Sequence, residues 1–150
     1  MRVIIQRSQD SWVEVDDVTI GLINKGFVLL VGVTHEDTVL DVDYCVRKVS
    51  KMRLFEDSEG KTNLSLSDVD GQILSISQFT LYGNTKKGNR PSFIYAANPD
   101  YAEELYGLFN SKLRQAGFIV EEGQFGANMN VHINNDGPMT IIIDSKQTDL

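Results

Sequence analysis

The stretch ISQFTLYG, residues 76–83, begins like the end of a buried strand and then turns polar before it reaches a glycine. Ser77, Gln78, Phe79 and Thr80 would place short polar side chains and consecutive backbone N–H groups at the end of that strand. Such groups can stabilise the negative charge that develops on a carbonyl oxygen during nucleophilic attack, as in an oxyanion hole. We therefore treat these four residues as candidate catalytic residues.

Thr80 is the first candidate for a nucleophile, but a hydroxyl needs a neighbouring base to activate it. No histidine or lysine in the sequence is obviously placed to do so. His35, at a strand end, is interpreted as a surface residue, and His132, inside an alternating segment, as a structural one. The residue types therefore favour attack by a water molecule.

The sequence lacks the motifs of several other chemistries. A catalytic zinc ion needs three protein ligands, and two separated histidines do not support such a site. Glycine-rich nucleotide-binding loops, the G-x-S-x-G elbow and the H-E-x-x-H motif are absent. Cys45 falls on the apolar face of a predicted helix and is expected in the core. We expect no metal and no cofactor.

The net charge of the chain limits how it could bind nucleic acid. A net charge of −7 argues against bulk, non-specific binding, which requires many phosphate contacts. One dense basic cluster, TKKGNR, places Lys86, Lys87 and Arg90 in a glycine-containing loop. This cluster could contact RNA locally, or it could be an ordinary solvated loop.

Hydrophobic patterning predicts the elements that position these residues. Alternating or continuous apolar runs predict four strands in the first part of the chain, at 2–8, 11–15, 18–23 and 27–33. Turn residues at Asp16-Asp17 and Lys25-Gly26 predict hairpins between neighbouring strands. Later strands are expected at 72–81, 128–134 and 138–144, the last two joined by a turn at Asn135-Asp136-Gly137.

Two helices are predicted between these strands. Apolar residues three and four apart from Val39 to Met52 mark one helix face, with Glu36 and Asp37 at its positive end. The second helix begins at NPD, where Asn98 can cap, and ends at Gly117. The pattern predicts an α+β fold with a mainly antiparallel sheet or partial barrel and two main helices.

Size and apolar content set the remaining limits. A chain of 150 residues fits a single domain, residues 1–150. Its longest apolar run, Phe27–Val33, is far shorter than the roughly 20 residues of a membrane span, and residues 1–10 do not resemble a signal peptide. With one cysteine, the composition predicts a cytoplasmic protein with no membrane contact.

Five short motifs together resemble the D-aminoacyl-tRNA deacylases. They are SQFTL at 77–81 and NDGPMT at 135–140, together with VIIQR at 3–7, RPSF at 90–93 and FGANM at 125–129. The resemblance spans nearly the whole chain. It departs at Met139, where valine is common in the family, which should affect packing more than chemistry.

This resemblance implies hydrolysis of the ester that joins a D-amino acid, or glycine, to the terminal adenosine of tRNA, as chirality proofreading in translation. It implies a homodimer with active sites at the interface, where the cis Gly137-Pro138 peptide of one subunit reaches into the site of the other. Arg7 would hold that turn. Further substrate-binding residues would be Phe125, Gly126, Ala127 and Met129. The alternative for DGP is an ordinary hairpin turn.

The implied mechanism is physically consistent. Carbonyl groups of Gly137 and Pro138 could stand where an L side chain would project, so that only a hydrogen atom fits. A methylene difference in a pocket gives only about 1–3 kcal/mol of discrimination, whereas a backbone wall excludes every L side chain. The 2′-hydroxyl of the terminal ribose could orient the attacking water. Lys86, Lys87 and Arg90 could contact phosphates, and Phe79 and Phe125 could stack on adenine or pack in the core.

Two other functions stay open at this point. A dimeric, non-catalytic nucleic-acid-binding module would use the TKKGNR loop and exposed aromatic residues, but it leaves the SQFT and NDGP motifs unexplained. A small-molecule esterase or amidase on the same scaffold would use those motifs without tRNA. Inhibition by uncharged tRNA separates the esterase from the tRNA enzyme.

Overall fold

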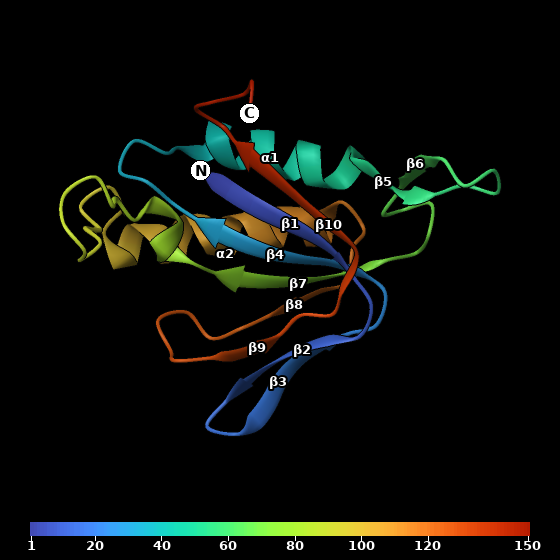
Figure 1. Ribbon diagram of the computed structural model, residues 1–150, viewed down its shortest axis with the longest axis horizontal. Coiled ribbons are helices and arrows are strands. Elements are labelled where there is room, and N and C mark those ends of the chain that lie inside the picture. The colour runs from blue at the N-terminus through green and yellow to red at the C-terminus, as the bar shows by residue number, and fades with distance from the viewer.

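The computed structural model describes residues 1–150 as strands and helices arranged around two apolar cores (Figure 1). In chain order the elements are β1 (Arg2–Ser8), β2 (Ser11–Val15), β3 (Val18–Ile23), β4 (Gly26–Gly32), α1 (Val39–Lys51), β5 (Arg53–Glu56), β6 (Thr62–Ser65), β7 (Gln72–Ser77), the 3-10 helix η1 (Phe79–Tyr82), α2 (Pro99–Gln115), β8 (Val120–Glu122), β9 (Asn130–His132) and β10 (Asn135–Asp144). The predicted α+β class with two main helices is confirmed.

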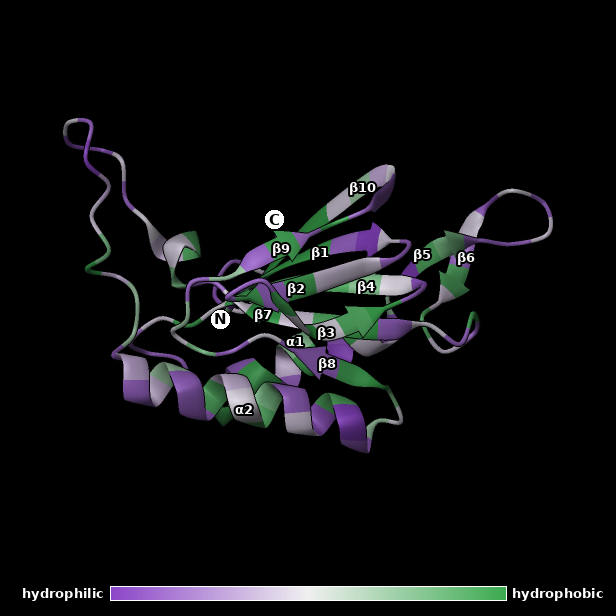
Figure 2. Cartoon of the chain, turned by 90° about the horizontal axis from the view of Figure 1, so that it is seen from below, coloured by the Kyte–Doolittle hydropathy of each residue, from purple (hydrophilic) through white to green (hydrophobic).

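The larger sheet has five strands in the order β10-β1-β4-β7-β8. β1 runs antiparallel to both β10 and β4, whereas β7 runs parallel to both β4 and β8. α1 and α2 contribute to the main core together with Phe27, Leu29 and Val31 of β4. Figures 1 and 2 show α2 lying along one side of this sheet.

The smaller sheet has the order β3-β2-β9 and shares a second core with the larger one. Val13 and Ile23 pack there against Val28, Leu74 and Ile76. β4 is therefore apolar on both faces, because Val28 faces this core while its neighbours face the helices. This burial on both sides explains the continuous run FVLLVGV, which alternation alone would not predict.

The first predicted turn is confirmed and the second is not a hairpin. Asp16 and Asp17 both adopt positive φ, 49° and 63°, between the paired strands β2 and β3. Lys25-Gly26 instead carries the chain from the smaller sheet to the larger one, since β3 and β4 belong to different sheets. A Cβ on Gly26 would lie 1.8 Å from the carbonyl oxygen of Gln72, so the parallel pairing with β7 requires glycine.

Both predicted helices are confirmed, and their N-termini are capped by side chains. Thr38 and Asp41 form a capping box at the start of α1. The Asn98 side chain accepts from the N–H of Asp100, with Pro99 in the first turn of α2. Cys45 is fully buried in the main core, as expected. Neither helix is long and apolar enough to cross a membrane.

Three strand predictions need correction. The expected hairpin at Asn135-Asp136-Gly137 is wrong, because these residues lie inside β10, which pairs with β1, while β9 pairs with β2. The strand expected at 72–81 ends at Ser77, where the chain turns into η1. β5, β6 and β8 were not predicted, since each has only three or four residues.

Candidate active-site cleft

The polar stretch of the sequence lies where β7 ends. Gln78 still donates its backbone N–H to the carbonyl oxygen of Val31 at 2.7 Å, but β4 itself ends one residue later. Without a further partner strand the chain turns into η1, closed by a bond from Leu81 N–H to the Gln78 carbonyl at 3.2 Å. The first N–H groups of such a helix have no intrahelical acceptor, so those of Phe79 and Thr80 are free to bind another group.

A cleft of about 720 Å³ opens beside this turn. It is lined mainly by apolar residues from β4, β7, the start of α2 and the loop before β9. Seven of the residues predicted from the sequence line it, namely Ser77, Gln78, Phe79, Phe125, Gly126, Ala127 and Met129. An apolar cleft with a few polar groups is the usual form of a small-ligand site.

The segment 123–129 is held against the end of β7. The N–H of Gly123 donates to the Ser75 carbonyl at 3.2 Å, and a Cβ on Gly123 would lie only 2.5 Å from Sδ of Met129. Phe125 is half-buried, with its ring 6.0 Å from that of Tyr106. Tyr106 donates its hydroxyl to the Ser75 carbonyl at 2.7 Å, and burial raises its pKa, so it remains a neutral phenol.

Two aromatic side chains stand at the mouth of the cleft. Phe79 is 56% exposed and Phe93 is 39% exposed, and their rings meet edge to face with centroids 5.2 Å apart. Phe79 is therefore not a core residue, which removes the packing alternative for this position. An exposed ring beside a cleft can stack on a planar ligand such as a nucleobase.

Thr80 lies just outside the lining residues and has no basic partner. Its hydroxyl oxygen accepts a 2.5 Å hydrogen bond from Nε2 of Gln78. His35 lines the cleft, but its Nε2 lies 2.6 Å from the carbonyl oxygen of Ile94 and must donate to it. His132 stacks on Trp12 at 4.4 Å between ring centroids, within the smaller sheet. Neither histidine is hydrogen-bonded to Thr80.

Arg7 and the DGP segment form a separate group that does not line this cleft. Arg7 is buried, and its Nε donates to the Asp136 carbonyl at 3.1 Å while Nη1 donates to the Leu54 carbonyl at 2.8 Å. Gly137 and Pro138 are exposed and are joined by a cis peptide bond. A Cβ on Gly137 would lie 3.0 Å from Nη2 of Arg7, so the guanidinium lies directly behind this segment.

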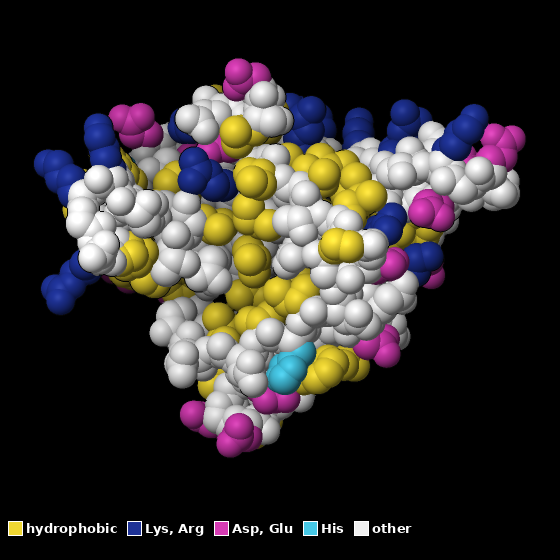
Figure 3. Space-filling view, in the orientation of Figure 1, with side chains coloured by type: hydrophobic (Ala, Val, Ile, Leu, Met, Phe, Trp, Pro, Cys, Tyr) yellow, Lys and Arg dark blue, Asp and Glu magenta, His cyan; other side chains and the backbone are white.

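The basic cluster lies on the loop between η1 and α2. Lys86, Lys87 and Arg90 are all exposed, and none of them forms an ion pair. A bridge between Asn84 and Ser92 closes the base of the loop. Figure 3 shows basic side chains projecting at the left margin, where Figure 1 draws this loop.

Several lining residues were not predicted from the sequence. Tyr106 was missed because it lies between Leu105 and Leu108, which the helical pattern already placed on the buried face. Phe93 could have been found, since it ends the RPSF motif at 90–93. His35 was interpreted as a surface residue, and it is exposed, but it also lines the cleft and bonds the Phe93 loop.

Comparisons with known proteins agree on one family. Residues 4–144 match the family model described as D-Tyr-tRNA(Tyr) deacylase. A D-aminoacyl-tRNA deacylase of Bacillus thuringiensis (strain Al Hakam) is 55% identical over 146 residues, which is 97% of this chain and 100% of the relative. The corresponding protein of Bacillus cereus (strain G9842) is 56% identical with the same coverage.

Two solved structures share the fold. A protein described as "c-Myc DNA Unwinding Element Binding Protein" is 38% identical, with a TM-score of 0.90 over 96% of this chain and 98% of that one. A "probable eukaryotic D-amino acid tRNA deacylase" has a TM-score of 0.83 over 95% and 97% of the two chains. At 18% identity, this second likeness concerns the fold alone.

Proposed function

The chain belongs to the D-Tyr-tRNA(Tyr) deacylase family, and we propose that it hydrolyses the ester bond of D-aminoacyl-tRNA to give the free D-amino acid and tRNA. The main support within the molecule is one arrangement. The end of β7, with Ser77 and Gln78, and the segment Phe125–Met129 line the same apolar cleft although about fifty residues separate them. This cleft suits the aminoacylated terminal adenosine.

Neighbouring parts of the cleft would hold different parts of the substrate. Phe79 and Phe125 offer aromatic faces for the adenine, and the glycine and alanine after Phe125 leave room beside it. The ester carbonyl would lie at the turn into η1, where the N–H groups of Phe79 and Thr80 can donate to the developing oxyanion. This role explains why polar residues stand at the end of β7, which the packing of the strand alone does not explain.

The attacking group would be water. A Thr80 nucleophile would need a base, and its hydroxyl is bonded only to the Gln78 amide. The water oxygen would form a bond to the ester carbonyl carbon, and the bond from that carbon to the ribose oxygen would break. The departing ribose oxygen would take the proton that the attacking water gives up. The neighbouring 2′-hydroxyl of the ribose can orient the water, which makes the RNA a participant in its own deacylation.

Chiral selection would depend on a second copy of the chain. Gly137 and Pro138 are exposed and do not line the cleft of their own chain. In a homodimer they could enter the partner's cleft and present carbonyl oxygens to the substrate ammonium group. Any L side chain would then meet backbone atoms. A hydrogen atom would fit, so D-aminoacyl groups and glycine, including glycine mischarged on alanine tRNA, would be accepted.

The remaining features agree with an enzyme that binds tRNA only at its acceptor end. Lys86, Lys87 and Arg90 would contact phosphates near the cleft, while the net charge of −7 disfavours bulk binding elsewhere. A small basic patch allows quick release of the deacylated tRNA. Such proofreading accompanies translation, so we expect the protein to act in the cytoplasm.

The alternative of a non-catalytic nucleic-acid-binding module has one specific support, the name of the 38% identical structure as a DNA unwinding element binding protein. The exposed basic loop would then be the whole site. This function assigns no role to the cleft, and it predicts nucleic-acid binding without ester hydrolysis. A small-molecule esterase would hydrolyse esters but would not be inhibited by uncharged tRNA.

The test is deacylation of matched D- and L-tyrosyl-tRNA by the purified chain with a chelator present. We expect fast release of D-tyrosine alone, inhibited by uncharged tRNA. A Gly137→Val variant, shown to be folded and dimeric, should lose activity or selectivity. Gly60→Val is the matched control, because Gly60 also has positive φ but no atom lies within 4 Å of its added Cβ. A wild-type chain inert to both substrates would overturn the proposal.

A further inference from the structure

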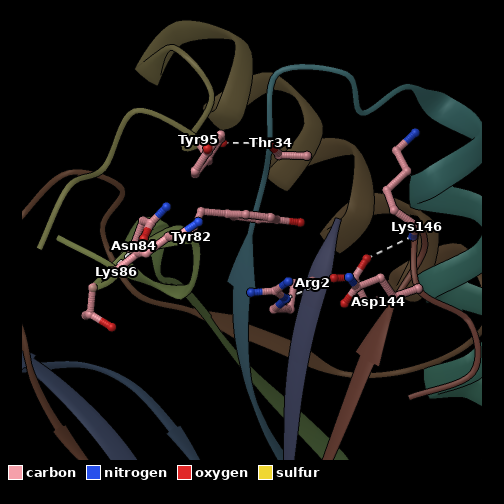
Figure 4. Close-up of a pocket in the computed structure, with 11 residues that line it drawn as sticks. Arg2, Thr34, Tyr82, Asn84, Lys86, Tyr95, Asp144 and Lys146 are labelled. Carbon is pink, nitrogen blue, oxygen red and sulfur yellow. Dashed lines mark hydrogen bonds and ion pairs between the residues drawn. The ribbon is translucent and has the colours of Figure 1, made fainter.

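A second, polar cleft of about 600 Å³ lies where η1 ends, lined by Tyr82 and the residues that follow it (Figure 4). Only two of its eleven lining residues are hydrophobic. In Figure 4, Asn84 and Lys86 lie at one end of it and Asp144 and Lys146 at the other, with Arg2 and Tyr82 between them. Its walls come from the basic loop, the start of β1 and the end of β10.

The cleft carries a positive balance on an acidic protein. Arg2, Lys86 and Lys146 line it, with Asp144 as the single acidic lining residue. Asp144 is already bonded to Nε of Arg2 at 2.9 Å, and Lys146 lies 3.2 Å from Asp41. Lys86 has no ionic partner, so its charge is available to a ligand.

Arg2 is held in place yet keeps donors free. Its Nη1 donates to the Leu81 carbonyl at 2.8 Å, and its guanidinium lies 4.8 Å from the centre of the Tyr82 ring. These contacts and the Asp144 bond use two of its five N–H groups. Tyr82 contributes a hydroxyl that is buried without a hydrogen-bond partner. An anion in this cleft would meet the fixed N–H donors of Arg2 and the unpaired ammonium group of Lys86.

Phe79, at the start of η1, lines the first cleft, and Tyr82, at its end, lines the second. Four residues of a 3-10 helix rise about 8 Å, at about 2.0 Å per residue. Along the axis of a stacked strand, each phosphate is displaced from the next by about 3.4 Å. A strand whose terminal ester lies at the Ser77 end of η1 would therefore bring an earlier phosphate to the Tyr82 end.

We propose that this polar cleft, around Arg2, Tyr82 and Lys86, binds a backbone phosphate of the acceptor strand one or two nucleotides before the terminal adenosine. The inference rests on the proposed function and adds to it a defined second site. It also separates the basic residues: Lys86 lines the cleft, whereas Lys87 and Arg90 do not. Lys86 would thus fix the register of the strand relative to the ester.

The kinetic test compares D-tyrosyl-tRNA with D-tyrosyl-adenosine, which has the ester but no phosphate. Lys86→Gln should lower kcat/KM on the tRNA about fivefold at low salt, the size of one exposed charge contact, and leave the adenosine ester unaffected. The slope of log kcat/KM against log salt should flatten by about 0.7. Lys86→Arg should retain the wild-type values.

Lys61→Gln is the matched control, since it makes the same change in net charge at an exposed residue of the distant β5–β6 hairpin. Equal effects of Lys86→Gln and Lys61→Gln on the tRNA would overturn the inference. An equal loss on both substrates would also overturn it, because Lys86 would then act at the ester and not through a phosphate.

A binding arm keeps the inference testable if the chain proves inert as a deacylase. An RNA trinucleotide ending in adenosine should bind the wild type more tightly than its analogue with neutral methylphosphonate linkages, and Lys86→Gln should remove this difference. Equal binding of the two oligonucleotides would contradict the inference. Inorganic phosphate that binds the wild type while the trinucleotide does not would assign the cleft to a free anion instead.

Discussion

The Nε atom of Arg7 donates to the carbonyl oxygen of Asp136 at 3.1 Å, which ties β1 to the residue directly before Gly137. The same guanidinium bonds the Leu54 carbonyl, so one buried side chain joins the DGP segment to the helix-covered side of the sheet. In the proposed mechanism the wall that excludes L side chains has to be rigid, and Arg7 would supply this rigidity. Arg7 is therefore a positioning residue in the proposed mechanism.

Arg7→Lys should weaken both the fold and the selectivity. A lysine ammonium cannot reach both carbonyls in the planar geometry of a guanidinium, and a buried acceptor left unpaired costs about 1–3 kcal/mol. We expect a fall of that size in the free energy of unfolding in urea, with an increased rate on L-tyrosyl-tRNA relative to D-tyrosyl-tRNA. Arg53→Lys, at an exposed arginine of β5, is the control. Unchanged selectivity in a destabilised Arg7→Lys variant would limit Arg7 to folding.

Thr80→Val should retain kcat within about tenfold of the wild type. The substitution removes the hydroxyl that accepts from Gln78 but keeps the side-chain shape and the backbone N–H. Loss of a true nucleophile costs far more, about a millionfold in a serine hydrolase. Single-turnover deacylation of D-tyrosyl-tRNA measures the difference, with Thr62→Val as the control at another exposed threonine. Complete loss in a folded variant would contradict water attack.

Much of the fold could be predicted because its signals are local. The start of α2 follows from Asn98, whose side chain accepts the N–H of Asp100, and α1 begins just after the acidic pair Glu36-Asp37 that was expected at its positive end. The sequence contains no such local signal for the pairing of strands that are far apart in the chain. β10 joins β1 although about 130 residues separate them, and the NDG turn residues that suggested a hairpin instead lie within that strand.

The candidate site likewise combines features that could be predicted from the sequence with features that depend on long-range packing. Motif residues at 77–79 and 125–129 were predicted as one site by resemblance, and parallel pairing of β7 with β8 explains why they meet. The exposed position of Phe79 at a turn could not be predicted from the sequence. β7 ends where its partner strand β4 ends, and no local signal in the sequence marks this pairing. The polar cleft was also beyond prediction, since Arg2 and Lys86 come together only through the packing of η1.

Phe79→Leu should weaken tRNA binding with little effect on stability. The ring is 56% exposed, so its truncation removes little from the core. A base stacked on an aromatic ring gains about 1–3 kcal/mol, so we expect KM for D-tyrosyl-tRNA to rise about tenfold with kcat nearly unchanged. Ile94→Ala, on the loop between η1 and α2 and also exposed, is the control. A fall in kcat alone would place the ring of Phe79 at the ester instead of at the adenine.

Asp41 predicts a pH dependence of stability. Burial by itself would raise the pKa of this carboxyl, but hydrogen bonds from Ser145 and the Thr38 N–H, with Lys146 nearby, lower it from 3.8 to about 2. The folded pKa is the lower one, so the stabilisation is fully present above about pH 4 and is lost as the pH falls through 2. The difference corresponds to about 2 kcal/mol.

Asp41→Asn should therefore lower the free energy of unfolding by about 2 kcal/mol at pH 7, and the gap to the wild type should close between pH 4 and pH 2, because the amide does not titrate. Urea unfolding at several pH values measures this gap. Asp43→Asn is the matched control on the same helix: its ion pair with Lys112 is partly exposed to solvent and should contribute less than about 1 kcal/mol. A gap of constant size for Asp41→Asn down to pH 2 would show that the charge of Asp41 does not stabilise the junction between α1 and the segment after β10.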